Sequence, residues 1–199
     1  MKNIIVGFAI AATSLIACNN NKAADTKSTE VHNDAPKPGA AQKAPDTPVT
    51  TPTVAFPVKE IIAGYLQLKN ALTKDNGKDA ATAGNTIVAT LTTVDMKSLT
   101  KEQTKIYVDI ADDLKENAEH IGANAGKIEH QREHFVMLSK DVEDLIKTVG
   151  NGGQTLYKDF CPMANDGDGA VWLSEVKEIK NPYLGSKMIT CGMVKETIK

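Results

Sequence analysis

Apolar residues recur at spacings of three and four in four stretches of the chain, which is the repeat of an amphipathic helix. The stretches cover residues 58–72, 80–91, 106–121 and 127–146. The stop signal Asn76-Gly77 follows the first, and a glycine-rich break begins at Gly150 after the fourth. Thr100 precedes Gln103 by three residues, the relation of a capping box, just ahead of the third. Four such helices with short connections predict a mainly α fold, an antiparallel four-helix bundle.

The pattern changes at about residue 154, beyond which no helical repeat continues. Residues 154–199 are rich in aromatic residues, glycine and proline and hold two of the three cysteines. The run Asp166-Gly167-Asp168-Gly169 is typical of a turn between two strands. We therefore expect a small C-terminal unit of loops and short strands that packs on one end of the bundle.

The N-terminus shows a third pattern, an apolar run that ends at a cysteine. Residues 4–16 carry no charged side chain, and the run is shorter than the roughly 20 residues that a membrane-spanning helix needs. It ends in Leu15-Ile16-Ala17-Cys18, which resembles the lipobox of bacterial lipoproteins. The resemblance implies that residues 1–17 are a cleaved signal peptide and that Cys18 is lipidated. The expected location is the cell envelope, facing the periplasm, with the lipid in the outer or inner membrane.

Between the lipid and the helices, residues 18–56 are rich in alanine, threonine and proline. This composition buries too little apolar surface to fold, so we expect a flexible tether. Residues 57–199 are long enough for one domain with a core of its own. The formal net charge is −2, and the basic residues are dispersed among acidic ones, so we expect no nucleic-acid partner. No nucleophile with a matching base is recognisable, so no enzyme is expected.

Sulfur is concentrated at two places in the C-terminal unit, Cys161-Pro162-Met163 and the run from Met188 through Cys191 to Met193. Cys161 and Met163 are two residues apart, as are Cys191 and Met193, so each pair points to one side of an extended strand. Thiolate and thioether ligands favour Cu(I), with Ag(I) or Zn(II) as lesser possibilities. The two clusters together predict a site for a soft metal ion.

A disulfide is the competing interpretation of the same two cysteines. A bond between Cys161 and Cys191 would close a loop of about 30 residues and contribute roughly 3–4 kcal/mol in the chain-entropy model. Methionines are also common gap-fillers in protein cores. Under this interpretation the chain is a disulfide-stapled interaction module that docks on an envelope complex without a metal of its own.

Short motifs spread over residues 58–199 resemble an uncharacterised periplasmic domain family of bacterial lipoproteins. The motifs are Ala118-Glu119-His120-Ile121, Gln131-Arg132-Glu133-His134-Phe135, Leu138-Ser139, Cys161-Pro162-Met163, Trp172-Leu173-Ser174, Ile179, Asn181-Pro182-Tyr183, Gly185, Met188 and Cys191-Gly192. Related domains are appended to the periplasmic adaptor subunits of copper- and silver-type efflux systems. The resemblance implies a role in copper or heavy-metal handling, with an efflux adaptor or a metallochaperone as partner.

The histidines offer further candidate ligands. His120 lies in the motif shared with the family, near the end of the third predicted helix, where it could face the sulfur-rich tail and add an imidazole ligand. His130 and His134 are one helical turn apart and could hold a metal together, although this spacing often arises by chance. They also match the inverted zinc-peptidase motif His-x-x-Glu-His. Without a third ligand or a large catalytic domain, that match does not favour a peptidase.

Overall fold

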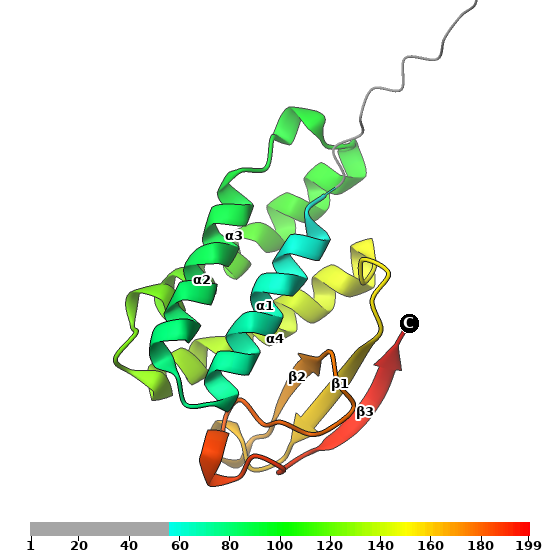
Figure 1. Cartoon of the computed structure of the whole chain (residues 1–199). Helices are drawn as coiled ribbons and strands as arrows, with labels where there is room; N and C mark the ends of the chain where they lie inside the picture. The colour runs from blue at the N-terminus through cyan, green and yellow to red at the C-terminus, as the bar shows by residue number, and fades with distance from the viewer. Residues whose placement is uncertain (1–55) are drawn as a thin grey trace, which may run out of the picture. The chain divides into compact units, whose positions relative to one another are not determined.

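The computed structural model describes residues 56–199, which form four helices followed by three strands (Figure 1). The helices are α1 (Val58–Thr73), α2 (Gly77–Thr92), α3 (Lys101–Ala123) and α4 (Ile128–Val149), and the strands are β1 (Leu156–Cys161), β2 (Ala170–Ser174) and β3 (Met193–Ile198). The expected mainly helical chain with a C-terminal unit of short strands is confirmed. The expected signal peptide, the lipidated Cys18 and most of the expected tether lie outside the described residues.

Local sequence signals mark the starts of α2 and α3 and the end of α4. At the start of α3 the Thr100 hydroxyl accepts a hydrogen bond from the Gln103 backbone at 3.2 Å, and the Gln103 side chain accepts one from the Thr100 backbone at 2.9 Å. The predicted capping box is therefore present. The Asn76 side chain caps α2, and Gly150 follows α4 with a φ of 91°, a left-handed conformation that suits glycine.

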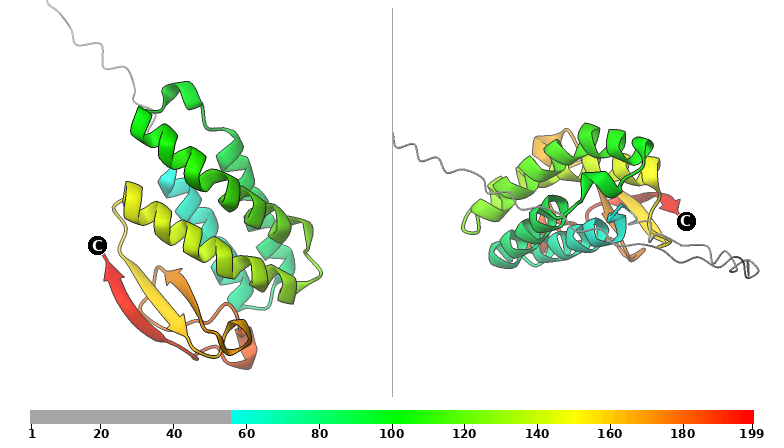
Figure 2. Two further views of the ribbon diagram at one scale, coloured as in Figure 1. Left: turned by 180° about the vertical axis from the view of Figure 1, so that it is seen from behind. Right: turned by 90° about the horizontal axis from the view of Figure 1, so that it is seen from above.

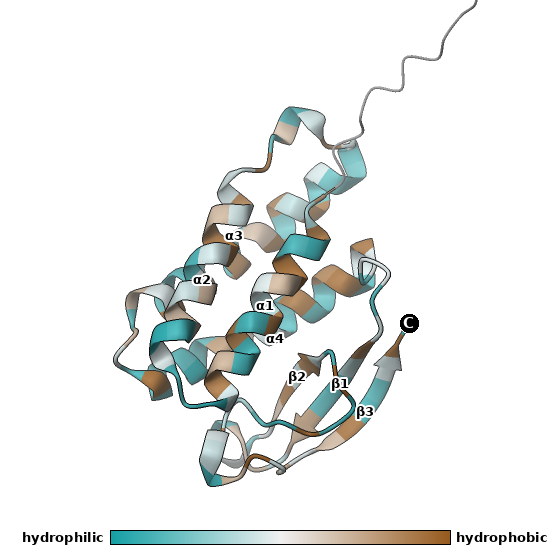
Figure 3. Ribbon diagram, viewed as in Figure 1, coloured by the Kyte–Doolittle hydropathy of each residue, from teal (hydrophilic) through white to brown (hydrophobic). Residues whose placement is uncertain are grey.

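Consecutive helices pack against each other, and α4 also contacts α1 and α2. Apolar and polar segments alternate along each helix, as amphipathic packing requires (Figure 3). Tyr65 of α1 and Phe135 of α4 are both fully buried, and their rings stack with centroids 5.2 Å apart. The helical repeats read from the sequence thus supply one shared core. Within residues 56–199, no helix is long and apolar enough to cross a membrane.

The three strands form an antiparallel sheet in the order β2-β1-β3. Strand β2 contacts α4 and α1, whereas β3 forms the edge on the other side of β1 and ends at the C-terminus (Figures 1 and 2). The β1–β2 connection contains Asp166-Gly167-Asp168-Gly169, so the predicted hairpin is confirmed. The β1–β3 pairing shifts register between Lys158 and Asp159, which marks a bulge.

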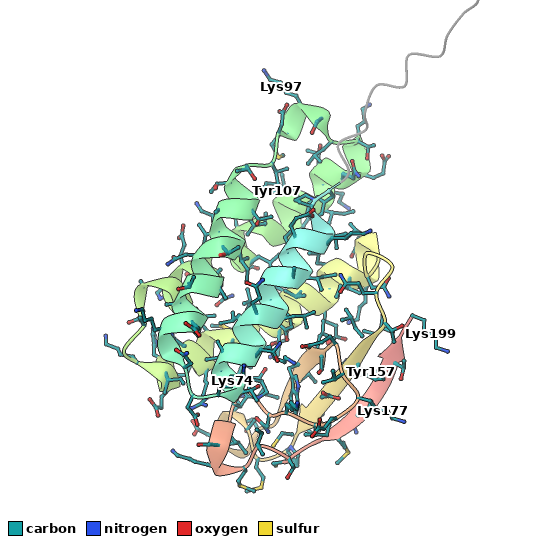
Figure 4. All side chains as sticks on the ribbon, viewed as in Figure 1. Lys74, Lys97, Tyr107, Tyr157, Lys177 and Lys199 are labelled. Atoms are coloured by element: carbon teal, nitrogen blue, oxygen red, sulfur yellow. The ribbon has the colours of Figure 1, made fainter. Side chains whose placement is uncertain are left out.

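Buried hydroxyl groups connect the sheet to the helices. The Tyr65 hydroxyl lies 2.8 Å from that of Ser139 and accepts a hydrogen bond from the Leu173 backbone at 3.0 Å. The Tyr183 hydroxyl donates to the Val171 carbonyl at 2.5 Å. Side chains fill the space between α1, α4 and the sheet (Figure 4). Because these groups are satisfied only in one arrangement, they fix how the C-terminal unit sits on α1 and α4.

Candidate metal centres

The structure brings the two cysteines of the C-terminal unit together. Cys161 ends strand β1 and is fully buried, and Cys191 lies in the turn before β3 and is partly exposed. Their Sγ atoms are 2.8 Å apart, and both are free thiols. Residues thirty positions apart in the chain therefore share one site.

Asn181 holds the turn that carries Cys191. Its side chain is fully buried, and its Nδ2 donates a hydrogen bond to the Cys191 carbonyl at 2.7 Å. Its Oδ1 accepts hydrogen bonds from the backbones of Tyr183 and Leu184, at 2.8 and 3.0 Å. Its own backbone N–H donates to the Ile189 carbonyl. The Asn181-Pro182-Tyr183 motif thus positions one thiol without contacting a ligand itself.

Gly192 brings the chain after Cys191 close to the sheet. A Cβ atom at this position would lie 2.8 Å from the Trp172 ring, closer than real Cβ contacts allow, and 3.0 Å from the Phe160 carbonyl oxygen, closer than most of them. Its φ of 145° is also one that residues with a Cβ rarely adopt. Trp172 is fully buried, so it cannot move away. Glycine at this position is what lets Cys191 reach Cys161.

The contact with Cys161 also changes the acidity of the Cys191 thiol. The hydrogen bond with Cys161, reinforced by burial, raises the pKa of the Cys191 thiol above its ordinary value. The thiol is therefore protonated at neutral pH, whereas a metal binds the thiolate. Metal binding at this pair must release protons.

Three methionines surround the cysteines in sequence, and all three lie at the surface. Met163, Met188 and Met193 are 56, 42 and 48% exposed, so they are not gap-fillers in the core. Met163 lines a groove of about 250 Å³ together with Glu129 and Glu133 of α4. Exposed thioethers on unbranched side chains are free to turn toward an ion bound nearby.

A second cluster, which the sequence did not predict as a unit, joins α3 and α4. His120 lies in the last turn of α3, and His130 and His134 lie in α4. One potential ligand nitrogen from each ring lies within 4.8 Å of the other two. We call these three residues the histidine cluster. Among residues 56–199, the ligand group that contains His120 includes no cysteine, although the sequence suggested that His120 would face the sulfur-rich tail.

The rings of the histidine cluster contact one another directly. The His120 and His134 rings stack with centroids 4.2 Å apart and planes at 12°. The His130 ring meets the His134 ring edge-on, with centroids 4.6 Å apart. His120 is exposed, and the other two are half-buried. Burial, followed by the neighbouring imidazoles, lowers the pKa of His134, which favours its neutral form.

Hydrogen bonds fix the orientation of His134. The buried Asn117 side chain donates through Nδ2 to the Asp113 carbonyl at 3.0 Å and to the Asp141 carboxylate at 3.1 Å. Its Oδ1 is therefore left as the acceptor for His134 Nδ1, 3.0 Å away. His134 then carries its proton on Nδ1, and Nε2 keeps a free lone pair. Burial also raises the pKa of Asp141 to about 6.

His130 has a comparable partner, and the surroundings are acidic. The His130 Nδ1 lies 3.1 Å from a Glu133 carboxylate oxygen, which leaves Nε2 free in the same way.

A groove of about 320 Å³ borders His134 and is lined by Asp113, Glu116 and Asp141, with Lys140 as its one basic residue. Three carboxylates against one ammonium group favour a cation in this groove.

The sequence contained a signal for the histidine cluster. The turn between α3 and α4 spans residues 124–127, and His120 and His130 stand at similar distances on its two sides. Residues at similar distances from a tight helix–helix turn face each other, and His134 lies one turn beyond His130 on the same face. The sequence pattern alone places His120 with the sulfur-rich tail and His130 and His134 together as a separate pair, so it does not predict a cluster of all three.

One segment of the chain matches a known protein family. Residues 61–154 match the family model described as a protein of unknown function (DUF3347), so a DUF3347 domain is present. The match runs from α1 to just before β1. It therefore includes the histidine cluster but neither Cys161 nor Cys191, whereas the sequence motifs suggested a resemblance over nearly all of residues 58–199. No curated protein and no solved structure matches the chain.

Proposed function

We propose that this protein is a lipid-anchored, periplasm-facing protein that binds a soft metal ion, most simply Cu(I), for buffering, resistance or transfer to an efflux system. The 2.8 Å separation of Cys161 Sγ and Cys191 Sγ is the observation that carries the proposal. The metal would be held at the tip of the C-terminal unit, on an antiparallel four-helix bundle. The lipobox-like sequence at Cys18 supports the location, and the motif resemblance supports an efflux adaptor or metallochaperone as partner.

The ligand chemistry supports a soft ion. Two thiolates and neighbouring thioethers are soft donors, and such donors select Cu(I) over hard cations. Two thiolates on one tetrahedral ion lie about 3.7 Å apart, given metal–sulfur bonds of about 2.3 Å. The pair must therefore open by about 1 Å on binding. Cys191 is the partly exposed member and lies in a turn, so it is the sulfur that moves.

The methionines complete the proposed site. Met163, Met188 and Met193 are all exposed and lie within three residues of a proposed thiolate ligand. A thioether adds a soft donor without adding charge, so a Cu(I) complex of two thiolates and one or two thioethers carries one net negative charge. His120 is not part of this set, because its ring contacts His130 and His134.

A disulfide-stapled interaction module is the second candidate function, and the closeness of the thiols favours it as well. In an oxidising compartment two thiols at this distance are readily joined, and the bond would close a long loop. The protein would then dock on an envelope complex through its surface. The two functions differ in whether the reduced thiols bind metal with high affinity.

An anaerobic titration separates the two functions. The full-length chain, purified in detergent and reduced, is titrated with Cu(I) against a competing chelator. We expect one tight equivalent, an affinity loss of at least about 100-fold in Cys161→Ser, and a loss of about tenfold in Met188→Leu. Met96→Leu is the matched control, because Met96 is an exposed methionine in the α2–α3 connection. Equal affinity in the parent and in Cys161→Ser would reject the metal function.

A further inference from the structure

We propose that His120, His130 and His134 form a second metal site, which takes a borderline divalent ion such as Zn(II) and is independent of the cysteine pair. This inference goes beyond the proposed binding of Cu(I), because it uses other residues, other donor atoms and another ion. It rests on the convergence of three imidazoles from two helices.

The donor set defines the class of metal. Imidazole nitrogens suit Zn(II), Cu(II) and Ni(II), whereas Cu(I) prefers sulfur. Three histidines leave the fourth position of a tetrahedral zinc ion open. Because His120 is exposed, that position faces solvent and is available to water or to a small anion. The histidine cluster is therefore a site at which an ion can enter and exchange.

The hydrogen bonds around the rings are those of a preorganised site. Histidines that bind a metal generally donate their second ring N–H to a carboxylate or a carbonyl oxygen. Here His130 has Glu133 on Nδ1, and His134 has Asn117 on Nδ1. Asn117 is itself oriented by Asp141, so a partly buried chain of hydrogen bonds supports His134 from behind. Both rings thus present Nε2 as the donor.

The geometry requires only side-chain rotation. Nitrogens bound to one zinc ion at about 2.0–2.1 Å lie roughly 3.3 Å apart, and one ring nitrogen from each of the three histidines lies within 4.8 Å of the other two. The stacked His120 and His134 rings cannot both aim at one ion while parallel, so one of them must turn. His134 is held by Asn117, whereas His120 is exposed and free to turn.

Two electrostatic features favour a cation at the histidine cluster. His120 lies in the last turn of α3, where unpaired carbonyl groups carry partial negative charge. The adjoining acidic groove lined by Asp113, Glu116 and Asp141 adds carboxylate charge beside His134. Both features attract a divalent cation more strongly than a monovalent one.

A Zn(II) titration of the full-length chain in detergent, against a chromophoric zinc indicator, tests the proposal. We expect one equivalent to bind, with the affinity at least about tenfold lower in His120→Gln and in His134→Gln. His32→Gln is the matched control, because His32 is the remaining histidine of the four and lies outside the described domain. The control should bind as the parent does, and circular dichroism should show unchanged helix content in every variant.

The cysteine variants make the two sites distinguishable. Cys161→Ser combined with Cys191→Ser should keep the zinc equivalent, even if the proposed Cu(I) site proves wrong. If His134→Gln fails to fold, the exposed His120→Gln decides the question. The proposal is overturned if the chain binds no zinc or if both histidine variants bind zinc as the parent does. It is also overturned if zinc affinity falls instead when the two cysteines or His32 are replaced.

Discussion

The cysteine pair and the histidine cluster are built in different ways within one domain. The cysteines come from a strand end and an irregular turn, and a buried asparagine and a glycine against Trp172 bring them together. The histidines come from two regular helices on either side of one short turn, and they are exposed or half-buried. A site of the first kind depends on tertiary contacts throughout the C-terminal unit. A site of the second kind depends mainly on helix pairing, so each should fail under different substitutions.

The largest effect is expected from Gly192→Ala. The added Cβ would collide with Trp172 and the Phe160 carbonyl at an unfavourable φ, so we expect a loss of roughly 2–4 kcal/mol in the free energy of unfolding. Denaturant titration measures the loss. Gly126→Ala is the control, since a Cβ there meets nothing within 4 Å, and it should change stability by less than about 0.5 kcal/mol.

The same variant should affect the metal affinities of the two sites differently. Where the folded form of Gly192→Ala persists, Cu(I) affinity should fall because Cys191 is displaced from Cys161. Zn(II) affinity should stay at the parental value, because the histidines belong to α3 and α4. A parallel loss of both affinities would show that the two sites are not built independently.

The second-largest effect is expected when the hydrogen bond that orients His134 is removed. In Asn117→Ala the acceptor for His134 Nδ1 is lost, so we expect Zn(II) affinity to fall about 10–100-fold while Cu(I) affinity is unchanged. Competition titrations with both ions measure this. Asn85→Ala, at an exposed position of α2, is the matched control. Unchanged zinc affinity in Asn117→Ala would show that the hydrogen bond between Asn117 and His134 does not contribute to zinc binding.

The helices and the cysteine pair show how much of the fold and of the candidate site the sequence could predict. The helical repeats, the Thr100 capping box and the hairpin turn depend on residues close in sequence, and they were predicted. The closeness of Cys161 and Cys191 depends on contacts made by Asn181 and Gly192 across the folded unit, which no local pattern encodes. Both cysteines were therefore predicted as candidates, but their separation was not.

A smaller effect is expected at the contact between α1, α4 and the C-terminal unit. Hydrogen bonds from Ser186 and from Arg132 lower the pKa of Asp75 to about 2. A carboxylate whose folded pKa lies below its unfolded value stabilises the fold above about pH 4, and this contribution disappears as the pH falls toward 2. Arg132 also donates to the Pro182 carbonyl, so this contact holds the loop that leads to Cys191.

Asp75→Asn should therefore cost about 1 kcal/mol at pH 7, a value reduced for solvent screening at a partly exposed side chain. At pH 2, close to the folded pKa of Asp75, most of this difference should be gone. Denaturant titrations at pH 2, 4 and 7 measure the difference, with Asp112→Asn on the exposed surface of α3 as control. A difference that stays constant over this range would contradict the role of the Asp75 charge.

The smallest effect is expected at the start of α3. Thr100→Ala removes one side of the capping box and should lower stability by roughly 0.5–1 kcal/mol. The affinities for both metals should stay unchanged, because His120 lies at the opposite end of α3. Thermal unfolding measures the change, and Thr82→Ala at an exposed position of α2 is the control. A changed zinc affinity in Thr100→Ala would contradict a purely local role for the cap.

X-ray absorption at the copper and zinc edges shows directly whether the cysteine pair holds copper and the histidine cluster holds zinc. The reduced full-length chain is loaded with one equivalent of Cu(I) and one of Zn(II), and the ligand shell of each ion is measured in the same sample. We expect a sulfur shell at about 2.3 Å around copper and a nitrogen shell at about 2.0–2.1 Å, with imidazole scattering, around zinc. Copper surrounded by nitrogen and oxygen, or zinc bound to sulfur, would contradict the assignment of the two sites.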